Sequence, residues 1–181
     1  MSKKALVPIA DGTEEIEAVT IIDVLRRAGV LVTVASVDKI QITASRGVKL
    51  VADQSIADCV SNIYDLIALP GGMPGAEHLR DSMELEIMLK RQQRENRLYA
   101  AICASPVVVL QHHGLLEKRR ATCHPHFAGQ LENSEAMDSN VVVDGLCVTS
   151  RGPGTALEFA FKLIELLYSR QTSQDVSITM F

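Results

Sequence analysis

The sequence lacks a long apolar run of the length that a membrane-spanning helix needs, and no signal-peptide core follows Met1-Ser2-Lys3-Lys4, which leads directly into a strand-like segment. We therefore expect a cytoplasmic protein with no membrane partner. The sequence also lacks a basic cluster, since its net charge is -4 and its lysines and arginines are scattered among acids. A nucleic-acid-binding surface is not expected.

Motifs for metals, disulfides and nucleotides are also missing. The four cysteines, Cys59, Cys103, Cys123 and Cys147, form no C-x-x-C pair, and no carboxylate-rich cluster appears, so we expect neither a metal site nor a disulfide framework. The sequence has no G-x-G-x-x-G or Walker pattern, so nucleotide binding is not predicted. We expect no cofactor and a reducing compartment.

The composition that remains is that of an ordinary globular protein. Hydrophobic residues make up 47% and charged residues 22% of the 181 residues, which is enough for one substantial core. No repeat, linker or low-complexity segment divides the chain. We therefore expect a single domain over residues 1–181.

Strands and helices alternate along the chain. A strand at Ala5–Ala10 is followed by a turn and then by a helix that opens with acids and ends at Arg26-Arg27-Ala28-Gly29, and Leu31–Val37 completes a βαβ unit. Further strands are predicted at 64–69, 98–102 and, weakly, 120–123, hairpins at 40–51 and 140–149, and helices at 82–95 with Asp81 as N-cap, 106–111, 127–131 and 156–168. This alternation predicts a mostly parallel sheet covered on both faces.

The most reactive candidate, Cys103, lies in Ala100-Ala101-Ile102-Cys103-Ala104-Ser105-Pro106, which predicts a strand turning sharply into a helix. A thiol at a helix N-terminus is expected to have a lowered pKa that favours the thiolate. The alternative is an inert buried cysteine. Glu17 and the pair Gly71-Gly72 also follow strands, so connectivity brings them to the same sheet edge, where such folds bind ligands.

A cysteine nucleophile needs a proton carrier and donors for an oxyanion. Glu17 and His124 are candidate proton carriers, although an acid here also suits the helix dipole, the interpretation we prefer for Glu14 and Glu15. The backbone N–H groups of Gly71, Gly72 and Ala104 are candidate donors, the glycines having the alternative of a tight turn.

Several motifs occur in an order that resembles one known family. Gly12-Thr13-Glu14-Glu15-Ile16-Glu17-Ala18-Val19, Leu69-Pro70-Gly71-Gly72, Ala101-Ile102-Cys103-Ala104 and Thr149-Ser150-Arg151-Gly152-Pro153-Gly154-Thr155 are similar to the DJ-1/ThiJ/PfpI superfamily, above all its Parkinsonism-associated deglycase branch. The resemblance implies a flavodoxin-like three-layer α/β sandwich that forms a homodimer.

The resemblance also implies roles for single residues. Cys103 would be the nucleophile and the oxidation-sensitive thiol, Glu17 its hydrogen-bonded carboxyl group, and His124 the nearby histidine. The remaining implied residues are Gly72 and Ala104 as oxyanion donors, Arg46 approaching from the partner subunit, and Arg27 in the interface.

The implied activity is that of a glyoxalase that converts methylglyoxal to lactate without glutathione, or of a deglycase that reverses early glycation. The alternative is a redox sensor or redox-dependent chaperone that uses the same residues. Amidase or peptidase action is disfavoured because Ala104, rather than a histidine, follows Cys103.

Three features depart from the family pattern. Ser105 stands where alanine or glycine is usual, and Cys123 stands beside His124, which prompts the hypothesis of a reversible Cys103–Cys123 disulfide. The C-terminal residues 177–181 also differ from those of typical members.

Overall fold

A mostly parallel seven-stranded sheet forms the centre of the protein, described here from a computed structural model that covers residues 2–180. The strand order is β5-β2-β1-β6-β7-β9-β8, and only the β8–β9 pair is antiparallel. The strands are β1 Lys4–Ile9, β2 Leu31–Ser36, β5 Gln54–Ser55, β6 Leu66–Leu69, β7 Leu98–Ile102, β8 Val141–Asp144 and β9 Cys147–Ser150.

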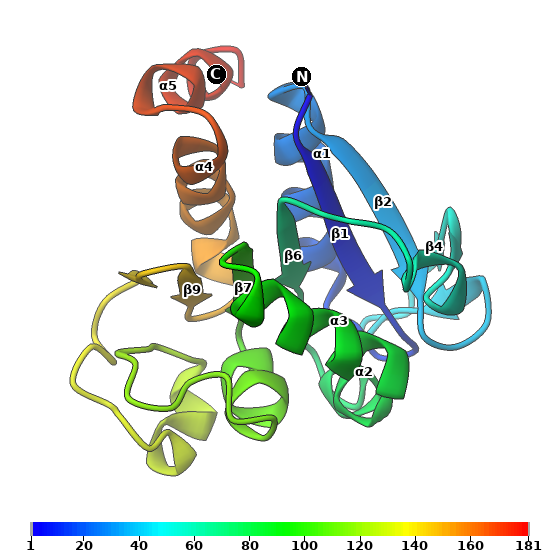
Figure 1. The fold of residues 1–181 in the computed structure, drawn as a ribbon, viewed down its shortest axis with the longest axis horizontal. Helices are drawn as coiled ribbons and strands as arrows, with labels where there is room; N and C mark the ends of the chain where they lie inside the picture. Colours follow the sequence, from blue (N-terminus) through cyan, green and yellow to red (C-terminus); the bar gives the residue numbers. More distant parts are fainter. Residues whose placement is uncertain (1, 181) are drawn as a thin grey trace.

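Helices cover both faces of this sheet (Figure 1). Helices α1 (Glu15–Arg27) and α4 (Ala156–Leu167) share one apolar cluster with the sheet, and α2 (Gly75–Asp81) and α3 (Met83–Arg94) share the other. Side chains of β1 alternate between the clusters, as the period of a strand requires. The expected flavodoxin-like three-layer fold is confirmed, whereas the single domain over 1–181 stays a prediction because Met1 and Phe181 lie outside the described residues.

The chain reverses its direction of travel across the sheet beside β1. Strand β2, reached through α1, pairs with one edge of β1, and β6 pairs with the other edge. A parallel sheet leaves a crevice at the carboxyl ends of its strands where the order reverses. The turns after β1 and β6 therefore border the position where this fold binds ligands.

A small antiparallel hairpin lies beside this edge, as predicted. It consists of β3 (Gln41–Thr43) and β4 (Lys49–Val51) and forms a separate two-stranded sheet. The N–H of Gly12 donates to the carbonyl of Thr43 at 2.8 Å, and the N–H of Ser45 donates to the carbonyl of Thr13 at 2.9 Å. These bonds fix the hairpin tip against the turn that follows β1.

Two local predictions are wrong. Residues 120–123 form no strand, because Thr122 N–H donates to the side chain of Thr149 at 2.9 Å and Arg120 N–H donates to the Asp144 carboxylate at 3.0 Å, so neither joins a backbone ladder. Ser82, rather than Asp81, caps α3 by accepting the Leu85 N–H at 3.3 Å.

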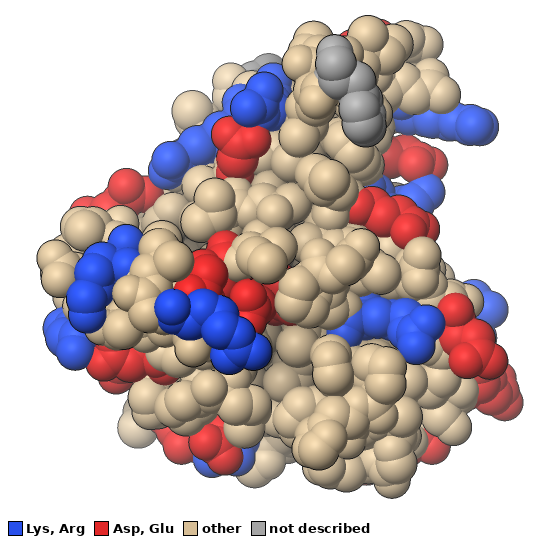
Figure 2. All heavy atoms as spheres, turned by 180° about the vertical axis from the view of Figure 1, so that it is seen from behind, with Lys and Arg blue, Asp and Glu red and all other residues tan. Residues whose placement is uncertain are grey.

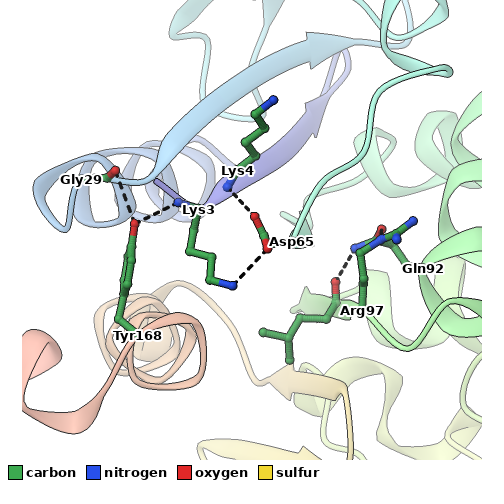
Figure 3. A network of polar contacts seen from close by, with 8 residues as sticks. Lys3, Lys4, Gly29, Asp65, Gln92, Arg97 and Tyr168 are labelled. Carbon is green, nitrogen blue, oxygen red and sulfur yellow. Dashed lines mark hydrogen bonds and ion pairs between the residues drawn. The ribbon is translucent and has the colours of Figure 1, made fainter. Parts of the chain in front are cut away.

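The opposite end of the sheet carries a polar network (Figure 3). Tyr168, which follows α4, accepts the Lys3 N–H at 3.2 Å, and Asp65 accepts both the Lys4 N–H at 2.8 Å and the Lys3 ammonium at 3.2 Å. An additional helix that the sequence did not predict, α5 (Arg170–Ile178), packs against α4. This end of the molecule therefore serves structure rather than the predicted site.

The surface seen from behind the view of Figure 1 mixes charges of both signs. Figure 2 shows basic and acidic groups interspersed there among uncharged residues. Within residues 2–180, each helix is too short or too polar to cross a lipid bilayer.

Candidate active site

A cavity of about 250 Å³ opens at the carboxyl edge of the sheet, where the predicted residues meet. The turns after β1, β6 and β7 and the hairpin tip contribute to its wall. The lining residues are Glu14, Ser45, Arg46, Gly72, Met73, Cys103, Ala104, His124, Phe127 and Pro153. Most of the candidate residues named from the sequence thus surround one small space.

Cys103 sits on the sharp turn that the sequence predicts between β7 and the π-helical segment Pro106–Gln111. Its φ angle is 66°, a left-handed conformation that is uncommon for a residue other than glycine and clusters at functional sites. The backbone is held on both sides: Cys103 N–H donates to Ser150 O at 3.0 Å, and Cys103 O accepts the His124 N–H at 2.8 Å. The turn leaves the thiol partly exposed to the cavity.

Glu17 lies in the first turns of α1 with its side chain fully buried. Its Oε2 accepts the Gly71 N–H at 2.7 Å, and its carboxyl group contacts the Cys103 thiol. Its Oε1 is buried and has no hydrogen-bond partner among the described residues. A protonated carboxyl group carries no charge, so its burial costs less than burial of a carboxylate.

Gly71 is used differently from the prediction. Its N–H is committed to Glu17, so it is unavailable to an oxyanion, and that assignment is corrected. A side chain at this position is also excluded, because a Cβ would lie 2.6 Å from Cys103 Cβ and 3.0 Å from Glu17 Oε2. Gly71 thus permits the close approach of Glu17 and Cys103.

The pKa values of the pair move upward together. Burial raises the pKa of Glu17 to about 7, although the hydrogen bond from Gly71 opposes this. Burial and then the charge of Glu17 raise the pKa of Cys103 to about 12, although the N–H groups of Gly72 and Ala104 oppose the rise. The predicted lowering of the Cys103 pKa is wrong, because burial and a neighbouring acid outweigh the turn's N–H groups. The resting sulfur is a thiol beside a base poised near neutral pH.

Gly72 and Ala104 both direct backbone N–H groups at the Cys103 sulfur. Gly72 has φ 87°, and a Cβ there would lie 2.4 Å from both Glu14 N and Gly12 O, so only glycine fits. Two N–H donors fixed beside a nucleophile can stabilise the oxyanion formed by its attack on a carbonyl. Their oxyanion role stays a prediction.

His124 lines the cavity, but its hydrogen bonding suits a donor better than the predicted base. Its Nδ1 accepts the His126 N–H at 3.2 Å. A neutral ring with an accepting Nδ1 carries its proton on Nε2, where it can only be donated. In this tautomer His124 supplies a hydrogen bond.

Glu14 is a cavity residue that the sequence interpretation assigned to the helix dipole. It is 8% exposed and, like Glu15, lies within hydrogen-bond distance of the Ser45 hydroxyl, at 2.7 Å and 2.8 Å respectively. The sequence signal that could have identified Glu14 as a cavity residue is the group of three acids that follows the end of β1.

Arg46 lines the cavity of its own chain, and its approach to the cavity of a partner subunit stays a prediction.

Ser105 connects the two turns of the site. Its hydroxyl, fully buried, donates to the carbonyl of Pro70 at 2.6 Å. Pro70 precedes the glycines that face Glu17 and Cys103, so this bond fixes the β6 turn against the cysteine turn. The extra hydroxyl therefore has a positioning role that alanine or glycine would not provide.

We expect Ser105→Ala to destabilise the protein by about 1–3 kcal/mol, since it leaves a buried carbonyl without a partner, and to lower turnover several-fold. Ser173→Ala is the matched control, because its hydroxyl donates to Phe161 O at 2.8 Å, away from the site. Urea unfolding and initial rates measure both variants. Equal loss of stability with equal turnover in the two variants would refute a positioning role.

Cys123 is buried, and its sulfur lies 3.9 Å from the sulfur of Met137. Burial raises the pKa of this thiol to about 11. All four cysteines are free in the structure, so the Cys103–Cys123 disulfide stays a prediction.

Among residues 2–180, no group of three or more histidine, cysteine or acidic side chains is arranged to hold a metal ion.

Comparisons with known proteins agree with this geometry. Protein DJ-1 homolog B of Arabidopsis thaliana is 47% identical over 178 residues, covering 97% of this chain and 41% of that protein. The chain therefore spans less than half the length of the two Arabidopsis relatives that it matches. Glutathione-independent glyoxalase DJR-1.2 of Caenorhabditis elegans is 36% identical over 168 residues, covering 91% of this chain and 89% of that protein.

A solved structure described as oxidised Toxoplasma gondii DJ-1 superimposes with a TM-score of 0.96 at 49% identity, covering 99% of this chain and 98% of that one. The sequence profile of the DJ-1/PfpI family matches residues 3–166. The resemblance deduced from the motifs is thereby confirmed: the chain belongs to the DJ-1/PfpI family.

Proposed function

We propose that this protein is a glyoxalase that converts methylglyoxal to lactate without glutathione, using Cys103 as its nucleophile. The observation that carries the proposal is the Glu17 carboxyl group, fully buried between the Gly71 N–H and the Cys103 thiol with a pKa of about 7. A base with a pKa near the working pH is well matched to proton transfer. A relative named as a glutathione-independent glyoxalase supports the same chemistry.

In the first step, the Glu17 carboxylate takes the proton from the Cys103 thiol as the sulfur bonds to the aldehyde carbon. The carbonyl oxygen becomes negative and accepts the N–H groups of Gly72 and Ala104, and a proton then completes a hemithioacetal. Glu17 returns the proton it took from the thiol, and the Nε2–H of His124 supplies a hydrogen bond to the same oxygen.

In the second step, the proton on the former aldehyde carbon moves to the adjacent ketone carbon through an enediol. The first carbon is oxidised to a thioester and the second is reduced to an alcohol, so no external oxidant or reductant is required. Water then cleaves the thioester, releasing lactate and restoring the thiol. Glu17 carries the protons, and the sum is methylglyoxal plus water giving lactate. A dicarbonyl adduct on a protein amine would follow the same reaction steps once the Cys103 sulfur has displaced the amine. That displacement is the deglycase activity.

The experiment that tests the proposal is lactate formation from methylglyoxal by the reduced protein in buffer without glutathione. We expect lactate to accumulate in proportion to enzyme and to the methylglyoxal consumed. Consumption of methylglyoxal without lactate, or negligible turnover, would refute the glyoxalase proposal.

A redox role for Cys103 is the second candidate, favoured by one observation. The otherwise unpartnered Oε1 of Glu17 could donate its proton to an oxygen added to the sulfur. Under this alternative, mild peroxide adds two oxygens to Cys103, and the oxidised protein acts as a sensor or chaperone. Negligible turnover of the reduced protein, together with that oxidation, would favour this alternative.

A homodimer is part of the proposal. Apolar side chains are exposed on α1 and the neighbouring hairpin, among them Ile16 (56% exposed), Val19 (47%) and Val51 (65%). Burying such a surface is favourable. Arg27, implied as an interface residue, pairs with Asp23 at 2.6 Å on the exposed side of α1. The mass of the particle in solution, measured by sedimentation velocity, tests the dimer.

A cytoplasmic location stays a prediction.

A further inference from the structure

A cavity of about 550 Å³, here called the amino-end cavity, lies at the end of the sheet opposite Cys103. Lys4 and Leu31, the first residues of β1 and β2, line this cavity, as does Tyr64, which lies just before β6. The cavity is therefore separate from the site at the carboxyl edge of the sheet. Its volume is in the range that small organic ligands occupy.

The cavity forms because the helices leave the amino ends of β1 and β2 uncovered. Lys4 and Leu31 are partners in the parallel register, so Lys4, Leu31 and Thr33 lie on one face of the sheet. This is the face that α2 and α3 cover, since Leu6 and Ala35, further along the same strands, belong to their apolar cluster. Leu31 is nevertheless 57% exposed. The uncovered end of the sheet therefore gives the cavity an apolar wall.

A second wall is the loop that leads into β6, and its shape is fixed without a ligand. The Asn62 side chain donates to the Tyr64 hydroxyl at 3.4 Å, and the Arg91 guanidinium of α3 donates to the Asn62 carbonyl at 2.6 Å. Tyr64 is 3% exposed, whereas Ile63 between these two residues is 63% exposed. A preformed wall lowers the ordering cost that binding would otherwise incur.

The charge at the amino-end cavity is positive. Lys4 is the charged residue of its lining, and no acid accompanies it among the described residues there. Figure 3 shows the Lys4 side chain extending away from Asp65, whose carboxylate accepts the Lys3 ammonium at 3.2 Å.

Two cations near the loop lack a compensating acid. Neither Lys4 nor Arg91 has an ion-pair partner between residues 2 and 180, and the buried Nε–H of Arg91 has no acceptor there. Uncompensated positive charge beside a cavity is complementary to an anionic ligand.

We propose that the amino-end cavity binds a small organic anion, a carboxylate attached to an apolar group. The apolar group lies against Leu31 and Ile63. The carboxylate accepts hydrogen bonds from the Lys4 ammonium and from the hydroxyl groups of Thr33 and Ser61. This assignment is independent of the glyoxalase proposal, because none of these residues lines the cavity at the carboxyl edge.

Calorimetric titration of the wild-type protein with naphthoate and with its neutral amide, naphthamide, tests the assignment. The two probes share one ring system and differ in charge. We expect one naphthoate to bind per chain, about two- to fivefold more tightly than naphthamide, which is the typical effect of an exposed ion pair. Added salt should reduce this difference. Lys4→Gln should abolish the preference for naphthoate and retain the binding of naphthamide.

Two control variants locate the binding site. Lys118→Gln removes another exposed lysine that has no ion-pair partner among residues 2–180 and does not line the amino-end cavity. Arg46→Gln removes the cation that lines the cavity at Cys103. Both variants should bind naphthoate as the wild type does. Absence of binding, equal binding of the two probes to the wild type, or loss of the preference in either control would overturn the assignment.

Discussion

Replacing Cys103 with serine should lower lactate formation by at least about 10³-fold, since a hydroxyl is a far weaker nucleophile than a thiol beside the same base. Serine differs from cysteine by one atom and retains the backbone bonds to Ser150 and His124. We therefore expect the variant to fold and to lose the chemistry alone.

Cys59→Ser is the control for removing a thiol. Cys59 is fully buried in the apolar cluster that α2 and α3 share with the sheet. Its sulfur accepts a hydrogen bond from Gln54 at 2.9 Å, which a serine oxygen can also accept. This control should retain turnover within about twofold, because residues away from the reacting groups affect catalysis little when the fold is kept. Comparable rates in both variants would contradict a nucleophilic Cys103.

Glu17→Gln should lower kcat/KM by about 10²- to 10⁴-fold, the usual contribution of a positioned general base. The amide oxygen of glutamine can still accept the Gly71 N–H that now donates to Oε2 at 2.7 Å, so the turn after β6 should persist. What disappears is the group that takes the thiol proton. A variant with nearly wild-type kcat/KM would show that the proton goes elsewhere.

The pH profile gives a second readout of this role. The carboxylate form of Glu17 is the active form, and its pKa is about 7, so kcat/KM of the wild type should rise with pH and level off above that value. The inflection should be absent from the Glu17→Gln variant. A wild-type profile without an inflection near neutral pH would contradict Glu17 as the base.

Stability should change with pH in the opposite direction. The Glu17 pKa is raised from 4.5 in the unfolded chain to about 7 in the folded protein, so the folded state binds the extra proton between these values. The stabilisation is present below pH 4.5 and lost as pH rises through 7, a loss of roughly 3 kcal/mol for this shift. Urea unfolding at pH 5 and pH 8 should show that Glu17→Gln loses less stability than the wild type.

The meeting of Cys103, Glu17 and Gly72 could be predicted from the sequence because it depends on connectivity. Each follows a strand, and parallel strands end at one edge of the sheet. The layers could be predicted from the alternation of strands and helices, and the hairpin that carries Arg46 from the alternating pattern over residues 40–51. Period and order along the chain are local properties, so the sequence displays them directly.

Features that depend on burial and on the partner of each polar group could not be predicted. The pKa of Cys103 is raised because its turn is buried next to the acid Glu17. The degree of burial of this turn cannot be read from the local sequence pattern. The Gly71 N–H donates to the Glu17 carboxyl group, and the Ser105 hydroxyl donates to the Pro70 carbonyl. Both hydrogen bonds join segments that lie far apart in the chain. Ser82 displaced Asp81 as a cap because α2 extends to Asp81 itself.

The most direct test of the central claim is mass spectrometry of the reduced wild-type protein, mixed with methylglyoxal and quenched with acid during turnover. The account predicts a methylglyoxal adduct on the peptide that contains Cys103, which appears before lactate, disappears when methylglyoxal is exhausted, and is absent from Cys103→Ser. Continued lactate formation with Cys103 unmodified at every time point would contradict covalent catalysis by this residue.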